Sequence, residues 1–177
     1  RHSFPTRRSS DLNTNNLGAS TVTRDGQSFV KISEYGGSGG TGVACNIQIW
    51  RLENPNTGTA NTVADCNGSI NNCAIVVYPL SDCDTSALVD AYTGGSGTGT
   101  PPAGSVTSTT DYCYIISGLV SEATISGVGA GQDSDASLVD QSFENTRATS
   151  KLGGVTGSQT ITYTGSSAAY AYMTVAI

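Results

Sequence analysis

The clearest pattern along this chain is the alternation of apolar and polar residues over positions 43–52. One side of the stretch carries Val43, Cys45, Ile47 and Ile49, and the other carries Asn46, Gln48 and Trp50. A period of two residues is typical of a β-strand with one buried face. The pattern therefore predicts a strand whose other side presents polar groups and a tryptophan.

A β-hairpin is predicted shortly before this strand. Asp25-Gly26 separates residues 21–24 from residues 27–33, and alternating residues flank the pair. Asp-Gly tolerates the positive φ angles of a type I′ turn, the turn that best matches the twist of two paired strands.

The rest of the chain also favours short strands joined by turns. Strands are predicted at 105–109, 112–117 and 123–126, a central strand at the apolar run 73–78, and a closing pair from 158–163 and 168–177. The glycine-rich stretches 35–42 and 94–104 are expected to be loops. No segment has the pattern of an amphipathic helix. The sequence pattern therefore predicts an all-β fold, an antiparallel β-sandwich of the jelly-roll or Ig-like kind.

The first residues change the domain boundaries. Residues 2–11 match the translation of a common short-read sequencing adapter, and Leu12 fits the codon that follows. We therefore treat residues 1–12 as an artefact and expect one β-sandwich domain over 13–177 that has lost an N-terminal strand. Without residues 1–12 the chain has no histidine. Five basic and thirteen acidic residues then remain, so the net charge is −8 rather than −6.

This acidic composition excludes several functions. Phosphate contacts need clustered Lys and Arg, so we expect no nucleic-acid partner. No stretch reaches the roughly 18 apolar residues of a membrane helix, so we expect no membrane insertion. Without histidine, carboxylate pairs are the remaining catalytic option, with Glu34, Glu53, Glu122 and Glu144 as candidates. Glutamates at strand ends are normally solvated, and we expect no enzyme.

The five cysteines point to an oxidising compartment, in which disulfides persist. Cys66 and Cys73 flank a turn-rich segment and are expected to form a disulfide. Cys83 and Cys113 form a second candidate pair, which leaves Cys45 over. Zinc is the competing interpretation, but the chain has no CxxC motif.

Two D-x-D pairs are candidates for structural calcium, the one cofactor that the sequence suggests. They are Asp82 with Asp84 and Asp133 with Asp135, in stretches expected to be polar loops. Calcium prefers several carboxylate and carbonyl oxygens on flexible loops. Neither pair completes an EF-hand motif, and solvated loops are the alternative.

Aromatic residues are the candidates for ligand binding, namely Trp50, Tyr112, Tyr114, Tyr170 and Tyr172. An exposed aromatic ring offers a flat apolar face while its polar edge stays wet. The tyrosines at 112 and 114, like those at 170 and 172, are two residues apart and are expected to share a strand face. An outward face would be an aromatic strip for sugars; the alternative is that these rings cap the edge of the core.

Several short motifs occur in a suggestive order. They are Val22-Thr23-Arg24-Asp25-Gly26, Ile49-Trp50-Arg51-Leu52, Asn54-Pro55-Asn56-Thr57-Gly58, the run 74–78, Asp82 to Asp90 around Leu88, Val106-Thr107-Ser108-Thr109-Thr110-Asp111, and 170–177. In this order the chain resembles an uncharacterised β-sandwich domain family of secreted and cell-surface bacterial and archaeal proteins. The resemblance implies a sandwich fold and an extracellular or cell-surface location. It brings no catalytic motif, and function depends on the site rather than on the fold.

These features favour a non-catalytic extracellular adhesion or carbohydrate-binding-type module of a larger surface protein. Its expected partner is a polysaccharide or another surface protein. One alternative is a structural protein of a surface layer, appendage or phage particle. The other is a fragment of a glycosidase.

Overall fold

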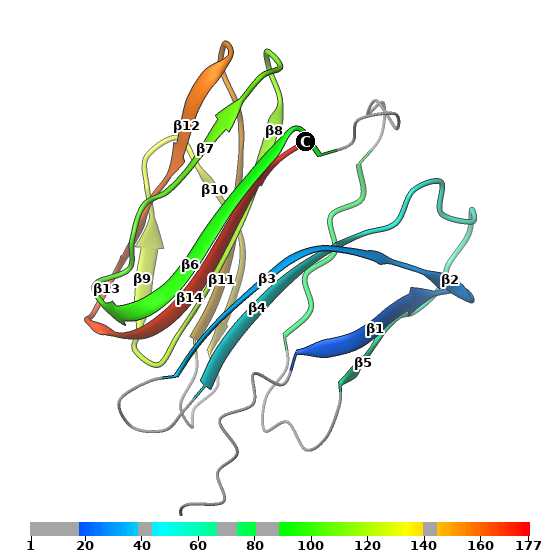
Figure 1. Ribbon diagram of the computed structural model, residues 1–177, viewed down its shortest axis with the longest axis horizontal. Helices are drawn as coiled ribbons and strands as arrows, with labels where there is room; N and C mark the ends of the chain where they lie inside the picture. The colour runs from blue at the N-terminus through cyan, green and yellow to red at the C-terminus, as the bar shows by residue number, and fades with distance from the viewer. Residues whose placement is uncertain (1–17, 39–43, 67–73, 81–88, 140–144) are drawn as a thin grey trace, which may run out of the picture.

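The computed structural model describes residues 18–38, 44–66, 74–80, 89–139 and 145–177. All the helix or strand structure in these ranges is β-strand, and every strand pairing is antiparallel (Figure 1). The predicted fold class, an all-β antiparallel β-sandwich, is confirmed. No helix in the described ranges is long and apolar enough to cross a membrane.

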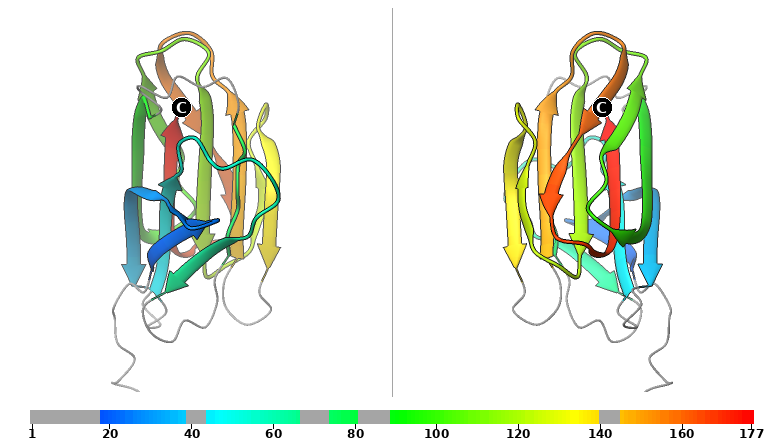
Figure 2. Two further views of the ribbon diagram at one scale, coloured as in Figure 1. Left: turned by 90° about the vertical axis from the view of Figure 1, so that its right-hand side faces the viewer. Right: turned by 90° about the vertical axis from the view of Figure 1, so that its left-hand side faces the viewer.

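A five-stranded sheet forms the centre of the molecule. Its order is β10 (Asp133–Val139), β11 (Asn145–Leu152), β8 (Tyr114–Ser121), β14 (Ala168–Ala176) and β6 (Ala91–Gly99). The interior strands β8 and β14 are buried along most of their length. Figure 2 shows these long strands side by side. A strand buried on both faces needs apolar or small residues at successive positions, as β8 has in Ile115 and Ile116.

Two strand pairs cover one face of this sheet. They are β7 (Gly104–Ser108) with β12 (Gly157–Ile161), and β9 (Ile125–Val128) with β13 (Tyr163–Gly165). The core between the two layers contains Ile115, Leu119 and Ile161, all fully buried. Each such side chain contributes roughly 1.5–3 kcal/mol by leaving water.

The opposite face is covered in part by the hairpin of β3 (Val30–Ser38) and β4 (Ala44–Arg51). Cys45 of β4 is fully buried against Val120 and Ala171, with Ile47 packed beside them. The predicted strand over 43–52 and its buried side are therefore confirmed by β4.

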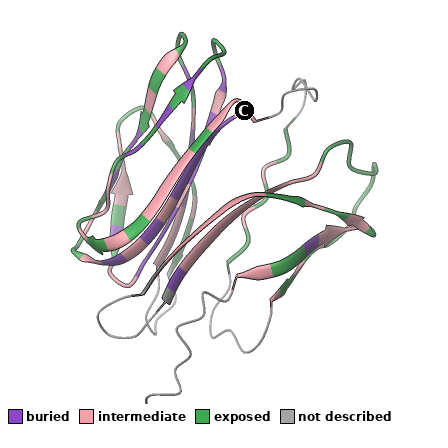
Figure 3. Cartoon of the chain, in the orientation of Figure 1, coloured by how far each residue is buried: buried purple, intermediate pink, exposed green. Residues whose placement is uncertain are grey.

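A small outer sheet lies beyond this hairpin, made of β2 (Gln27–Ser28), β1 (Ala19–Arg24) and β5 (Thr62–Cys66). Figure 3 shows that burial is concentrated in the sandwich, whereas β1 and β5 are mostly half-buried or exposed. The predicted hairpin turn is confirmed, because Asp25 and Gly26 have φ angles of 50° and 74°.

Four other expectations are wrong. The described residues 74–78 of the predicted strand 73–78 form no strand. Residues 35–38 and 94–99, both predicted to be loops, belong to strands β3 and β6. The last two predicted segments do form strands but do not pair with each other. Strand β12 pairs with β7, β13 with β9, and β14 with β6 and β8.

Candidate functional site

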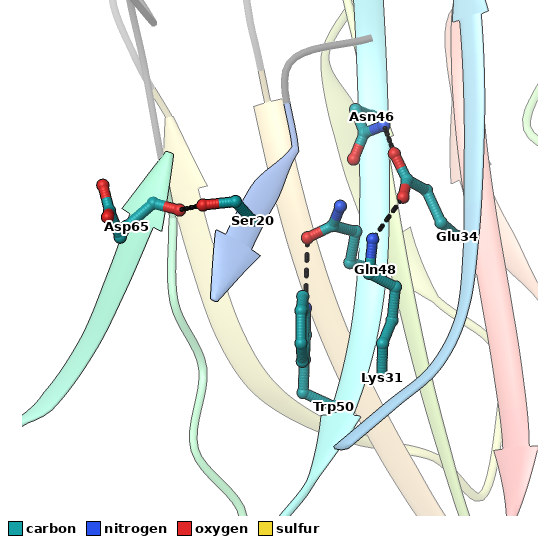
Figure 4. A network of polar contacts seen from close by, with 7 residues as sticks. All are labelled: Ser20, Lys31, Glu34, Asn46, Gln48, Trp50 and Asp65. Carbon is teal, nitrogen blue, oxygen red and sulfur yellow. Dashed lines mark hydrogen bonds and ion pairs between the residues drawn. The ribbon is translucent and has the colours of Figure 1, made fainter. Parts of the chain in front are cut away.

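The side of the β3–β4 hairpin that faces away from the five-stranded sheet carries a polar cluster around Trp50 (Figure 4). Because side chains alternate along a strand, the burial of Cys45 and Ile47 against the sheet turns Asn46, Gln48 and Trp50 to the other side. Strand β3 adds Lys31, which is opposite Trp50, and Glu34, which is opposite Gln48. We call these five residues, Lys31, Glu34, Asn46, Gln48 and Trp50, the Trp50 cluster.

Hydrogen bonds and an ion pair link the members of the cluster. Lys31 Nζ lies 2.7 Å from Glu34 Oε2, and Asn46 Nδ2 donates to Glu34 Oε1 at 2.7 Å. Trp50 Nε1 donates to Gln48 Oε1 at 3.0 Å. Lys31 Nζ also lies 5.0 Å from the centroid of the Trp50 ring, within the range of a cation–π contact.

Glu34 is the electrostatic centre of this cluster. Burial alone would raise the pKa of Glu34, but hydrogen bonds from Lys31, Asn46 and Gln48, together with the charge of Lys31, outweigh burial and lower it. The group is therefore an ionised carboxylate at neutral pH and acts only as a hydrogen-bond acceptor.

The outer sheet approaches the cluster closely at one point. A Cβ atom added at Gly18 would lie 1.9 Å from Gln48 Nε2 and 2.9 Å from Asn46 Oδ1. Ser20 Oγ donates to the carbonyl oxygen of Asp65 at 2.9 Å, which links the start of β1 to β5 beside the cluster. Gly18 is thus needed so that the chain can pass next to these two amide side chains.

An open depression of about 340 Å³ lies at the Arg51 end of the same hairpin. Its walls come from Gln27, Ser28, Val30, Arg51, Leu52 and Glu53. Arg51 and Glu53 form an ion pair of 3.1 Å across this end. No member of the Trp50 cluster lines the depression, so the two features are separate.

Tyr170 and Tyr172 do share one face of β14, as predicted, but this face packs against the sandwich core. Their ring centroids are 6.4 Å apart, and both side chains are half-buried. Both rings lie over glycines of β6. A Cβ atom added at Gly97 would lie 3.1 Å from Tyr170 Oη, and a Cβ atom added at Gly95 would lie 3.3 Å from the Tyr172 ring. Burial raises the pKa of Tyr172, with smaller contributions from the neighbouring tyrosines.

Tyr112 and Tyr114 do not share a strand face, so this expectation is wrong. Tyr112 lies in the turn before β8 with a φ of 59°, and 68% of its surface is exposed. Tyr114 is the first residue of β8 and is half-buried, and its hydroxyl hydrogen-bonds to Ser150 Oγ at 2.8 Å. An aromatic strip therefore does not form here.

The D-x-D candidates divide between two parts of the chain. Asp133 and Asp135 belong to strand β10 rather than to a loop, and Asp135 Oδ2 accepts a hydrogen bond from the Tyr78 hydroxyl at 2.7 Å. Asp82 and Asp84 lie outside the described residues. Within the described ranges no three His, Cys, Asp or Glu side chains come together as a metal site would need.

The disulfide expected at Cys66 is absent, because Cys66 carries a free thiol. Cys113 is also a free thiol, and it is buried, so the second candidate bridge is wrong as well. Both expected partners, Cys73 and Cys83, lie outside the described residues. Turn-rich spacing in a sequence does not by itself establish the distance and orientation that a disulfide requires.

Among the described site residues predicted from the sequence, Trp50 is the one that lies in a cluster with four polar residues. Sequence alternation placed Asn46 and Gln48 beside Trp50. The positions of Lys31 and Glu34 depend on the register of β3, which shifts between Lys31 and Ser33. Such a bulge moves side chains between faces and is not visible in the alternation of β3.

The comparisons with known proteins add no relative. No family model matches the chain, and no curated protein or solved structure matches it either.

Proposed function

We propose that this domain is a non-catalytic extracellular adhesion or carbohydrate-binding-type module whose Trp50 cluster binds a neutral polysaccharide. The observation that supports it is the half-buried indole of Trp50 beside Lys31, Glu34, Asn46 and Gln48. Small-molecule sites commonly combine an aromatic surface with a few placed polar groups.

The two kinds of side chain match the two kinds of surface on a sugar ring. The apolar C–H face of a sugar packs on an aromatic ring, and its hydroxyl groups both donate and accept hydrogen bonds. Asn46 and Gln48 each offer an amide oxygen and an amide nitrogen, and the Glu34 carboxylate offers acceptors. The existing hydrogen bonds hold these groups in place before a ligand arrives, which reduces the entropic cost of binding.

The charges near the cluster favour a neutral sugar over an acidic one. Every described basic side chain already has a partner within the protein. Lys31 is paired with Glu34, Arg51 with Glu53, and Arg24 donates to the carbonyl oxygens of Asn56 and Gly58. The chain has a net charge of −6, so its acidic groups would repel an anionic glycan, and no described basic side chain is unpaired to compensate.

The test is binding of the wild-type domain and two variants to a panel of neutral and acidic glycans. Trp50→Ala should abolish binding to the neutral glycans or weaken it at least tenfold, on the order of 1.4 kcal/mol. Tyr112→Ala is the matched control, because this aromatic residue is more exposed and belongs to the turn before β8 rather than to the β3–β4 hairpin. Thermal unfolding of each variant would show whether lost binding merely reflects lost folding. Equal binding by the wild type and Trp50→Ala would refute the proposed site.

A second candidate, a structural protein of a surface layer, appendage or phage particle, is favoured by one observation. The described stretch 74–80 exposes three large apolar side chains, those of Ile75, Val77 and Leu80. Exposed apolar rows of this kind often mark contacts between proteins.

A further inference from the structure

Residues 74–80 have the sequence of a strand but do not form one. The segment Ala-Ile-Val-Val-Tyr-Pro-Leu contains three β-branched residues in a row and no charge. Ile75 and Val77 are 47% and 53% exposed, whereas Val76 and Tyr78 between and after them are half-buried. The segment thus keeps the alternation of a strand, with an apolar row that faces water.

The main chain of this segment is also unpaired. Within the described part of the protein, residues 74–80 belong to no sheet and make no backbone–backbone hydrogen bond. A side chain holds the segment in place instead: the Tyr78 hydroxyl donates to Asp135 of the edge strand β10. In Figure 1 this segment is the green trace between the outer sheet and the sandwich.

We propose that residues 74–78 pair with the same residues of a second copy of this chain to form an antiparallel intermolecular ribbon. Unpaired main-chain N–H and C=O groups together with uncharged β-branched side chains form a template for strand addition. In a two-fold arrangement centred on Val76, Ile75 of one copy would lie opposite Val77 of its partner. This pairing satisfies the main chain and brings four apolar side chains together on one face.

A second copy fits this surface better than a partner of opposite charge. The chain carries a net charge of −6, and two copies repel each other wherever their acidic surfaces meet. The segment itself carries no charge, and the Asp135 carboxylate that it contacts already accepts the Tyr78 hydrogen bond. A basic partner would therefore find little to bind here, whereas a neutral, self-complementary strand suits the two-fold contacts of a homodimer.

Sedimentation velocity over a range of concentrations tests the proposal on the whole chain. The wild type should show a monomer–dimer equilibrium, and the double variant Ile75→Asp/Val77→Asp should weaken the dimer at least about tenfold. Leu152→Asp/Val155→Asp is the matched control, because these two apolar residues are each 67% exposed but lie elsewhere. The control should dimerise like the wild type.

Charge exchange then tests the pairing itself. The variant Ile75→Lys/Val77→Lys should also be monomeric alone, and mixing it with the double Asp variant should restore dimers, because lysines would then face aspartates. Circular dichroism establishes that each variant is folded. A wild type that stays monomeric at all concentrations, a dimer unaffected by the Asp variant, or a mixture that fails to associate would each overturn the proposal. Glycan binding by the Trp50 cluster does not depend on any of these results.

Discussion

Tyr35 of β3 lies directly against Gly94 of β6, where a Cβ atom would stand 2.4 Å from two carbons of the tyrosine ring. This contact joins the β3–β4 hairpin to the edge of the five-stranded sheet. Ser96 reinforces it two residues further along β6, since its Oγ donates to the carbonyl oxygen of Gly36 at 2.6 Å. The position of the Trp50 cluster on the outer side of the hairpin depends on this docking.

Gly94→Ala is therefore expected to lower the free energy of unfolding. The added methyl group would also approach the carbonyl oxygen of Tyr172 to 2.7 Å, so movement of Tyr35 alone cannot relieve the clash. Overpacking of this kind costs roughly 1–3 kcal/mol. Urea unfolding measures the change, and Gly154→Ala is the control because nothing lies within 4 Å of its added Cβ. Equal stability of the two variants would show that Tyr35 does not pack on Gly94.

The glycines of β6, which include Gly94, explain why the sequence did not predict this strand. Glycine has low strand propensity, so Gly94 to Gly99 resembled a loop. In the structure the rings of Tyr35, Tyr170 and Tyr172 lie over the bare backbone of β6 and replace the missing side chains. Neighbouring aromatic rings are known to compensate for glycine in strands, but which rings do so depends on contacts that are distant in the sequence.

Other errors have comparable physical causes. Strands β10 and β11 are rich in Ser, Thr and Asp and carry no apolar alternation, and β11 nevertheless forms an interior strand of the sheet. Residues 74–78 show the reverse case, with strong strand propensity and no strand. Only β4 and the Asp25-Gly26 hairpin combined a clear pattern with local turn chemistry, and both were predicted correctly. The clear alternation of β4 therefore made the position of Trp50 predictable. The positions of its partners on β3, Lys31 and Glu34, could not be predicted in this way.

A buried hydrogen-bond network inside the sandwich leads to a second prediction. Tyr163 Oη donates to Ser117 Oγ at 2.8 Å, and Ser117 lies within hydrogen-bond distance of the Met173 carbonyl oxygen and of Thr174 Oγ1. Ser117→Ala should cost more stability than Tyr163→Phe, because it leaves the buried Tyr163 hydroxyl without this partner. We expect about 1–3 kcal/mol for the first change and about 1 kcal/mol for the second.

Chemical denaturation of the two single variants and the double variant measures this difference. The double variant should be closer in stability to Ser117→Ala than the sum of the two losses would suggest, since both changes remove one shared hydrogen bond. Strictly additive losses would contradict the network.

The free thiols give a third prediction. Cys66 is half-buried near the end of β5, whereas Cys113 is buried in the sandwich core. An alkylating reagent should label Cys66 in the folded protein and Cys113 only after unfolding. Peptide mass spectrometry after timed labelling identifies each site, with fully denatured protein as the reference for complete reaction. Resistance of Cys66 to labelling in both states, removed by a reducing agent, would instead reveal a disulfide at this residue.

Asp90 gives a prediction for the dependence of stability on pH. Its Oδ1 accepts a hydrogen bond from the Thr109 hydroxyl, and its Oδ2 accepts from the backbone N–H groups of Thr109 at 2.6 Å and Thr110 at 3.2 Å. The Thr109 hydroxyl contributes most to a lowered pKa for Asp90; burial opposes the shift, and the two backbone hydrogen bonds reinforce it. A lowered pKa means that folding favours the charged carboxylate. Asp90 therefore stabilises the fold fully above its unfolded pKa of about 3.9, and this contribution is lost as the pH falls through the folded value.

Thermal unfolding of the wild type and Asp90→Asn between neutral and acidic pH checks this sign. The wild type should unfold at the higher temperature at neutral pH, and the difference should shrink as the pH falls below about 4. Asp65→Asn serves as the control, because the Asp65 carboxylate makes no hydrogen bond within the described residues and only its backbone oxygen accepts one, from Ser20. Asp65→Asn should therefore differ little from the wild type in its unfolding temperature at neutral pH. If the Asp90→Asn difference instead grew in acid, the carboxylate would be protonated in the folded state, and the turn before β8 would be held by other contacts.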